Sequence, residues 1–198
     1  MTIEEGVQLS RFTTIGTGGP ARAFARPETT AELQEALAFA AERGLAVATV
    51  GLGSNLLVAD EGFEGLALKL AGELAQVEFR LTPRPPEEIK ARVSELQAQR
   101  KAAQPTNKRT YGSVFKNPDH ELTAGRMLEA CGLKGHRIGG AQISPRHANF
   151  IENADGARSQ DAIALMAEAR RRAWEEYGVE LEHEVVFLGE LELPPLAK

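Results

Sequence analysis

Residues 111–118, with the sequence Tyr-Gly-Ser-Val-Phe-Lys-Asn-Pro, are the most informative stretch of this chain. The glycine indicates a turn, which presents the Ser113 hydroxyl beside the ammonium of Lys116 and the carboxamide of Asn117. Residues 126–135 follow as a short helix with a glycine at its exit. A hydroxyl, a cation and an amide gathered before a helix favour a small-molecule site.

The composition excludes several classes of protein. A chain of 198 residues with 42% hydrophobic and 26% charged residues is typical of a soluble globular protein, and a net charge of −5 argues against a nucleic-acid partner. Cys131 is the single cysteine, so no internal disulfide forms, and no Cys/His spacing resembles a metal site. No signal peptide and no apolar run of about 18 residues are found. We therefore expect a cytoplasmic protein with no metal and no membrane partner, and the sequence points to no protein partner.

Helix signals occur in four segments. Thr29 and Glu32 form a capping box at the start of the first, and glycines follow the first, third and fourth. In the last helix, Ala162, Met166 and neighbours at helical spacing line the inward side, whereas the arginines at 170–172 are interpreted as its solvated side. The predicted helices run from Thr29 to Gly44, from Pro85 to Gln104, from Thr123 to Cys131 and from Ser159 to about Tyr177.

Strand signals alternate with these helices. Residues 46–50 and 56–58 are short apolar runs on either side of a glycine loop, and residues 179–188 are predicted to form a strand after the last helix. Alternating elements predict an α+β or α/β arrangement in two layers, with a boundary near residues 82–86.

The glycine loop, Gly51-Leu52-Gly53-Ser54-Asn55, permits two interpretations. Its glycines allow positive φ angles and close approach of a ligand, so successive N–H groups can bind a pyrophosphate. It lacks the Gly-Lys-Ser/Thr ending of a Walker loop and the third glycine of the dinucleotide fingerprint. Without further context, a plain hairpin turn is the more common explanation.

The candidate site residues also have ordinary explanations. Ser113 can be a turn hydroxyl bonded to its own backbone, or a hydrolase nucleophile with His136 or His147, although no Gly-x-Ser-x-Gly elbow surrounds it. Glu184 alternates with other glutamates in the predicted strand, so a solvated strand edge is its ordinary explanation. Because Glu184 stands nearest to the apolar end of that strand, we expect it in a half-buried setting that perturbs its pKa. Lys101 can be a solvated helix-end residue.

Several motifs in fixed order resemble the UDP-N-acetylenolpyruvoylglucosamine reductases (the MurB family). The resemblance implies a mixed α+β fold, with a FAD-binding half of the PCMH/MurB type at residues 1–82 and a C-terminal α+β substrate domain at residues 83–198. The motifs are residues 13–21, 50–57, 111–118, 126–135 and 138–151, with Glu184 in His183-Glu184-Val185.

The resemblance also implies a reaction, in which FAD reduced by NADPH delivers hydride to the C3 methylene of a UDP-sugar enolpyruvyl ether during peptidoglycan synthesis. Ser113 would protonate C2, and Glu184 would help to stabilise the enolic intermediate. The residues implied in cofactor binding are Gly51, Gly53, Ser54, Asn55 and Leu56, and those implied in substrate binding are Asn117, Lys116 and Lys101.

One family segment is missing near residues 76 and 77. In the family, a long stretch with a second glycine-rich loop and a catalytic arginine precedes the strand that resembles residues 78–81. A natural deletion, an engineered one or an omitted disordered segment explains this seam equally well. If the deletion is real, one wall of the flavin site is absent, and a non-catalytic nucleotide-binding relative becomes an alternative.

Overall fold

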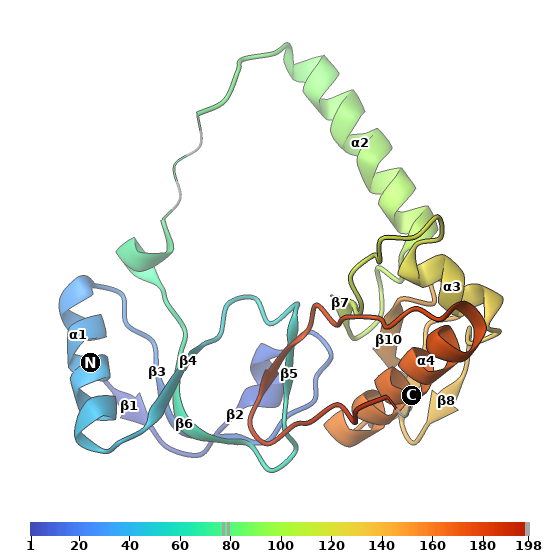
Figure 1. The fold of residues 1–198 in the computed structure, drawn as a ribbon. Coiled ribbons are helices and arrows are strands. Elements are labelled where there is room, and N and C mark those ends of the chain that lie inside the picture. Colours follow the sequence, from blue (N-terminus) through green and yellow to red (C-terminus); the bar gives the residue numbers. More distant parts are fainter. Residues whose placement is uncertain (77, 79, 197–198) are drawn as a thin grey trace.

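The fold is α+β, and the computed structural model describes residues 1–76, 78 and 80–196 of the chain (Figure 1). Within these residues, a mixed sheet lies at the N-terminal end and an antiparallel sheet at the C-terminal end, and a two-stranded sheet lies between them. No helix among the described residues is long and apolar enough to cross a membrane.

The N-terminal sheet has the strand order β1-β3-β6-β4, and β2 pairs with β3. The strands β3, β6 and β4 are parallel, so their carboxyl ends meet at one edge. The predicted helix α1 connects β3 and β4, and Thr29 accepts a hydrogen bond from the Glu32 N–H, as expected of the cap. The elements are β1 (Ile3–Glu4), β2 (Val7–Gln8), the 3₁₀ helix η1 (Leu9–Phe12), β3 (Pro20–Ala25), α1 (Thr30–Glu42), β4 (Ala46–Thr49) and β6 (Phe63–Leu68).

The two strands beside the glycine loop belong to different sheets. Strand β4 pairs with β6, whereas β5 (Leu56–Val58) pairs in parallel with β11 (Val186–Leu188) near the end of the chain. The hairpin interpretation of the loop is therefore wrong. The predicted strand over residues 179–188 is also shorter than expected, because only β11 and an isolated bridge between Phe115 and His183 form.

The C-terminal sheet has the order β7-β10-β9-β8, and all its pairs are antiparallel. The helix α4 packs on this sheet and buries Ala162, Met166, Ala169 and Ala173 as predicted, while Tyr177 is half-buried against the same core. The elements are β7 (Thr110–Ser113), α3 (Ala124–Ala130), β8 (Arg137–Ile138), β9 (Ala141–Ile143), β10 (Phe150–Asn153) and α4 (Ser159–Tyr177).

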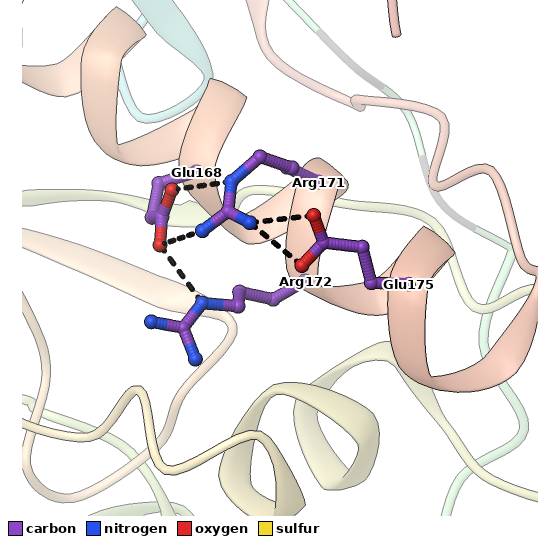
Figure 2. A network of polar contacts seen from close by, with 4 residues as sticks. All are labelled: Glu168, Arg171, Arg172 and Glu175. Carbon is purple, nitrogen blue, oxygen red and sulfur yellow. Dashed lines mark hydrogen bonds and ion pairs between the residues drawn. The ribbon is translucent and has the colours of Figure 1, made fainter. Parts of the chain in front are cut away.

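The three arginines of α4 do not share one solvated side. Arg171 and Arg172 are about half exposed and bind Glu168, and Arg171 also binds Glu175 (Figure 2). Their hydrogen bonds lower the pKa of the Glu168 carboxyl, the bond from Arg171 contributing most. The side chain of Arg170 is only 12% exposed and donates to the carbonyls of Leu181 and Pro194. The solvated interpretation is wrong for Arg170, because it holds the C-terminal segment against α4.

The connection between the two halves contains α2 (Pro86–Ala103), which begins and ends as predicted. None of its residues is buried, and its apolar stripe of Ile89, Val93 and Leu96 is about half exposed. Figure 1 shows α2 projecting from the rest of the structure, joined to β6 through the 3₁₀ helix η2 (Gly72–Ala75). The predicted strand at residues 78–81 and the seam at 76/77 include Phe79 and Val77, which lie outside the described residues.

Contacts other than this connection also join the two halves. Ile15 and Leu57 are fully buried in the same core as α4. The Ser159 hydroxyl donates to the carbonyl of Val58 at 2.6 Å, and the Asn153 carboxamide donates to the carbonyl of Ile15 at 3.0 Å. The division of the chain at residues 82/83 stays a prediction.

Candidate active site

The segment after β7 lies antiparallel to the segment before β11. The Glu184 N–H donates to the Val114 carbonyl at 2.8 Å, and the Lys116 N–H donates to the Glu182 carbonyl at 2.9 Å. Ser113 and Glu184, which are 71 positions apart in the sequence, are therefore held on neighbouring backbones.

The glycine loop joins this pair through Asn55. The Asn55 carboxamide donates to the Glu184 carbonyl at 2.9 Å, and the Asn55 carbonyl accepts from the Val186 N–H at 3.0 Å. Three predicted site elements, Ser113, Glu184 and the glycine loop, are thus brought together. The pairing of β5 with β11 is the reason, because it aligns the end of the loop with residue 186.

The glycine loop is exposed to solvent on one side and packs against Phe12 on the other. It follows the carboxyl end of β4, the edge at which parallel sheets usually bind ligands. Gly53 has a φ of +69°, and a Cβ there would lie 1.8 Å from the Phe12 carbonyl oxygen, so only glycine fits. Leu52 at the tip is 87% exposed. Among the described residues, no group accepts a hydrogen bond from the N–H groups of residues 51–55.

The Ser113 hydroxyl is half-buried and has no hydrogen-bond partner within the described part of the chain. The interpretation of a turn hydroxyl bonded to its own backbone is therefore not supported. Neither His136 nor His147 is hydrogen-bonded to it, and Nδ1 of His147 instead accepts from the Asn149 N–H at 3.2 Å. A free hydroxyl without a histidine base does not favour the hydrolase alternative.

Asn149 fixes the segment that carries Ser113. Its carboxamide is buried, accepting from the Phe115 N–H at 2.9 Å and donating to the Phe115 carbonyl at 2.8 Å. The Val114 N–H donates to the Asn149 carbonyl at 2.9 Å. Side-chain and main-chain bonds from one residue thus set the path of the backbone directly after Ser113.

Glu184 differs from its expected setting, and Lys116 and Asn117 have partners within the chain. Glu184 is exposed, so the expected half-buried setting is wrong. The side chains alternate as predicted, but the face that carries Glu184 and Val186 is the exposed one, and Leu181 and Val185 on the other face are buried. Lys116 forms an ion pair with Glu182. The Asn117 carboxamide oxygen accepts from the Ala124 N–H at 3.2 Å and so caps α3.

A pocket of about 230 Å³ lies between the glycine loop and the end of α2. Ser54 and Gly112 line it on one side, with Thr14, and the segment from Arg100 to Lys108 lines it on the other. Thr14 also binds the loop, since its hydroxyl lies 3.2 Å from the Gly53 carbonyl. Ser113 does not itself line the pocket, but its neighbour Gly112 does, so a ligand bound there contacts the loop and β7 together.

A second pocket of about 320 Å³ adjoins the first and is strongly basic. The predicted Lys101 lines it together with Lys108 and Arg146, and the Arg146 guanidinium donates to the Lys101 carbonyl at 2.6 Å. Lys108 and Arg146 were missed in the sequence, although basic residues on both sides of Gln104-Pro105 were a signal. Glu152, a residue that is 4% exposed, also lines this pocket.

A third pocket, of about 370 Å³, lies at the start of α3 and contains His147, Arg126 and Lys134. Burial lowers the pKa of His147, and the charge of Lys134 acts in the same direction. The Lys134 ammonium donates to Glu129 at 2.5 Å, which lowers the pKa of that carboxyl. Arg146 lines both this pocket and the second one, so cationic side chains border a continuous region.

Comparisons with known proteins agree with this geometry. Residues 21–105 match the model of an FAD binding domain, and residues 104–188 match the C-terminal domain of UDP-N-acetylenolpyruvoylglucosamine reductase. Together these matches define a two-part protein with a flavin-type N-terminal half and a reductase-type C-terminal half. The chain belongs to the UDP-N-acetylenolpyruvoylglucosamine reductase (MurB) family.

Individual relatives include the reductases of Anaeromyxobacter dehalogenans strain 2CP-C, 48% identical over 122 residues, and Paracoccus denitrificans, 42% identical over 125 residues. The matched parts are 62% and 58% of this chain but only 36% and 41% of the relatives. The chain thus spans less than half the length of these curated relatives. The crystal structure of the Thermus caldophilus MurB enzyme aligns with a TM-score of 0.79 and 27% identity, covering 96% of this chain and 100% of that chain.

Proposed function

We propose that this protein reduces UDP-N-acetylenolpyruvoylglucosamine to UDP-N-acetylmuramate, with FAD as cofactor and NADPH as reductant, in peptidoglycan synthesis. The observation that carries the proposal is the hydrogen-bonded junction of Glu184 with Val114, the residue after Ser113, and with Asn55 of the glycine loop. When bound, FAD supplies the hydride that adds to the C3 methylene of the substrate. The cytoplasmic location stays a prediction.

The glycine loop fits the phosphates of a dinucleotide cofactor. Free N–H groups on an open loop at the carboxyl edge of parallel strands are donors for an anion, and Gly53 keeps the required backbone conformation. The Lys69 ammonium lies 2.8 Å from the Gly51 carbonyl and adds positive charge nearby. We assign Gly51, Gly53 and the loop residues 54–56 to cofactor binding.

Ser113 suits the role of proton donor to the substrate. Its hydroxyl has no competing hydrogen bond within the described chain, and Asn149 fixes the backbone that follows it. Hydride addition at C3 leaves negative charge at C2, which the substrate carboxylate delocalises, and a hydroxyl at C2 supplies the proton. A positioned donor of this kind is worth roughly 10² to 10⁴ in rate.

The remaining site residues act on the charged parts of the substrate. Glu184 is exposed beside Ser113, and we propose that it orders groups around the enolic intermediate. Lys101 borders the basic pocket that would receive the diphosphate. Lys116 and Asn117 contribute to substrate binding on the side next to Ser113. For this, Lys116 must leave its ion pair with Glu182.

A second candidate is a nucleotide-binding protein without reductase activity. The observation in its favour is the connection between β6 and α2, whose described residues form only η2 and an exposed segment. The second glycine-rich loop and the arginine that the resemblance implies are not found in this sequence. One wall of the flavin site would then come from elsewhere or be lost.

Absorption spectroscopy with a mass measurement of the same sample separates the two candidates. The reductase is expected to be yellow, to bleach with NADPH and to regain its colour with the enolpyruvyl substrate. Ser113→Ala should keep the flavin band and lower turnover by roughly 10² to 10⁴. A colourless protein of the mass of these 198 residues that does not oxidise NADPH would refute the reductase.

A further inference from the structure

The basic pocket contains one residue whose charge opposes the rest of its lining. Glu152 is only 4% exposed as a residue and lines the pocket, and its carboxylate has no hydrogen bond or ion pair with a group in the described chain. Lys101, Lys108 and Arg146 line the same pocket. Carboxylates are rarely buried unless they are paired, so an unpaired one at a pocket wall indicates a partner from outside the chain.

The backbone explains why this carboxylate faces the pocket. Glu152 belongs to β10, where Ile151 points into the core beneath α4 and the residues on either side point to the opposite face. Phe150 on that face lines the pocket beside Ser54, and Glu152 lines the basic pocket. An irregularity in the pairing of β10 with β7 falls between these two residues, and such irregularities re-aim side chains.

We infer that Glu152 accepts hydrogen bonds from the vicinal hydroxyls of a ribose whose 5′-diphosphate binds the cations of the same pocket. The three cations select an anion of at least two charges, whereas the carboxylate repels phosphate and accepts only from donors. A ribose 5′-diphosphate satisfies both requirements, and carboxylates are used for ribose hydroxyls in other nucleotide sites. The choice of uridine as the base rests on the proposed function.

The arrangement of the pockets gives this ligand a direction. The basic pocket shares Pro105, Thr106 and Lys108 with the pocket that Ser54 and Gly112 line. A nucleotide with its ribose at Glu152 therefore extends its other end toward Ser54 and Gly112, the residue before Ser113. Glu152 would in this way act as a specificity residue that sets the position of the nucleotide.

The ordinary alternative is that Glu152 only balances the three cations. The two roles predict opposite signs for Glu152→Gln. If Glu152 is only a counter-charge, it weakens the binding of every anion. Its removal should then strengthen the binding of both UDP and inorganic pyrophosphate. If Glu152 accepts hydrogen bonds from the ribose, Glu152→Gln should weaken the binding of UDP by about tenfold. Pyrophosphate should then bind as tightly as before or about threefold tighter.

Isothermal titration of the full chain with UDP, 2′,3′-dideoxyuridine 5′-diphosphate and pyrophosphate tests the inference. The wild-type protein should prefer UDP over the dideoxy compound by about tenfold. Glu152→Gln should lose that preference and keep its affinity for pyrophosphate. As a control of equal charge change, Glu5→Gln alters an exposed glutamate and should keep the preference. If Glu152→Gln does not fold, Glu152→Asp, which withdraws the carboxylate, takes its place with the same expectation.

The inference is overturned if the wild-type protein does not distinguish the two nucleotides, or if the preference survives in the variant. Flavin colour and NADPH oxidation report separately on the proposed function. A yellow, active protein without the ribose preference overturns the role of Glu152 alone. A colourless protein that keeps the preference overturns the reductase and leaves the ribose site in place.

Discussion

Replacing Asn149 tests whether one carboxamide holds the segment after Ser113 in place. Asn149→Ala removes both partners of the Phe115 backbone, whose N–H and carbonyl bind the carboxamide at 2.9 and 2.8 Å. Asn149 is 4% exposed and Phe115 is 2% exposed, so solvent does not replace these bonds freely. The substitution therefore leaves one buried donor and one buried acceptor unsatisfied.

The expected loss follows from the cost of those two groups. An unsatisfied buried polar group costs about 1 to 3 kcal/mol, which gives about 2 to 6 kcal/mol for both. A water molecule in the vacated space would favour the lower half of that range, so we expect about 3 kcal/mol. For a chain of this size, about 3 kcal/mol corresponds to a Tm lower by roughly 6 to 12 °C.

Asn149→Asp adds a pH dependence with a defined sign. The oxygen that replaces the amide nitrogen faces the Phe115 carbonyl, so the folded state favours the protonated acid and raises the pKa of Asp above its unfolded value of about 3.9. A raised folded pKa contributes stability that is present below the unfolded value and is lost as the pH rises through the folded value. The variant should therefore approach wild-type stability most closely at acidic pH.

Urea unfolding followed by circular dichroism from pH 4 to pH 8 measures both effects. Gln34→Ala, at an exposed position of α1, is the control and should change the free energy of unfolding by less than about 0.5 kcal/mol. A loss below about 1 kcal/mol for Asn149→Ala would refute the reasoning. A deficit of Asn149→Asp that stays constant with pH would refute the assignment of the donor.

Three other perturbations are expected to have measurable effects on thermal unfolding. Gly53→Ala should cost more than about 3 kcal/mol because its Cβ would strike the Phe12 carbonyl, whereas Gly44→Ala, with a φ of +60° and open space, should cost only about 1 to 2 kcal/mol. Burial lowers the pKa of His147, so stability falls as the pH decreases below the unfolded value of 6.5, and His147→Gln should reduce that fall. Arg170→Met should cost about 2 to 3 kcal/mol, since it leaves two backbone carbonyls without their donor.

Local signals were sufficient for the helices and for α+β class. The bounds of α1 and α4 follow from the side chain of Thr29 and from Gly178, because capping is decided within a few residues. The pairing of β5 with β11 was not predictable, because it joins residues 56–58 to residues 186–188 and no local pattern encodes a partner so distant. The exposure of Glu184 was missed for the same reason.

The site was predicted in part because its residues lie in short motifs. Ser113 and the loop at residues 51–55 were identified from composition and resemblance, and in the structure Glu184 links them by its bonds to Asn55 and Val114. Glu152 was overlooked because a single acid beside apolar residues resembles an ordinary strand position. Its burial next to cations from three other segments is a property of the folded chain only.

Strand β11 pairs with β5 of the N-terminal half, so the two halves are held together without the connection through α2. Residues 80–85 and α2 are exposed, whereas β5 and β11, Ser159 and Val58 join the two halves elsewhere. A protease that cuts this exposed connection would leave two fragments that stay associated through the pairing of β5 with β11. The same strand pairing would let separately expressed halves reassemble, so the molecule is suited to fragment complementation.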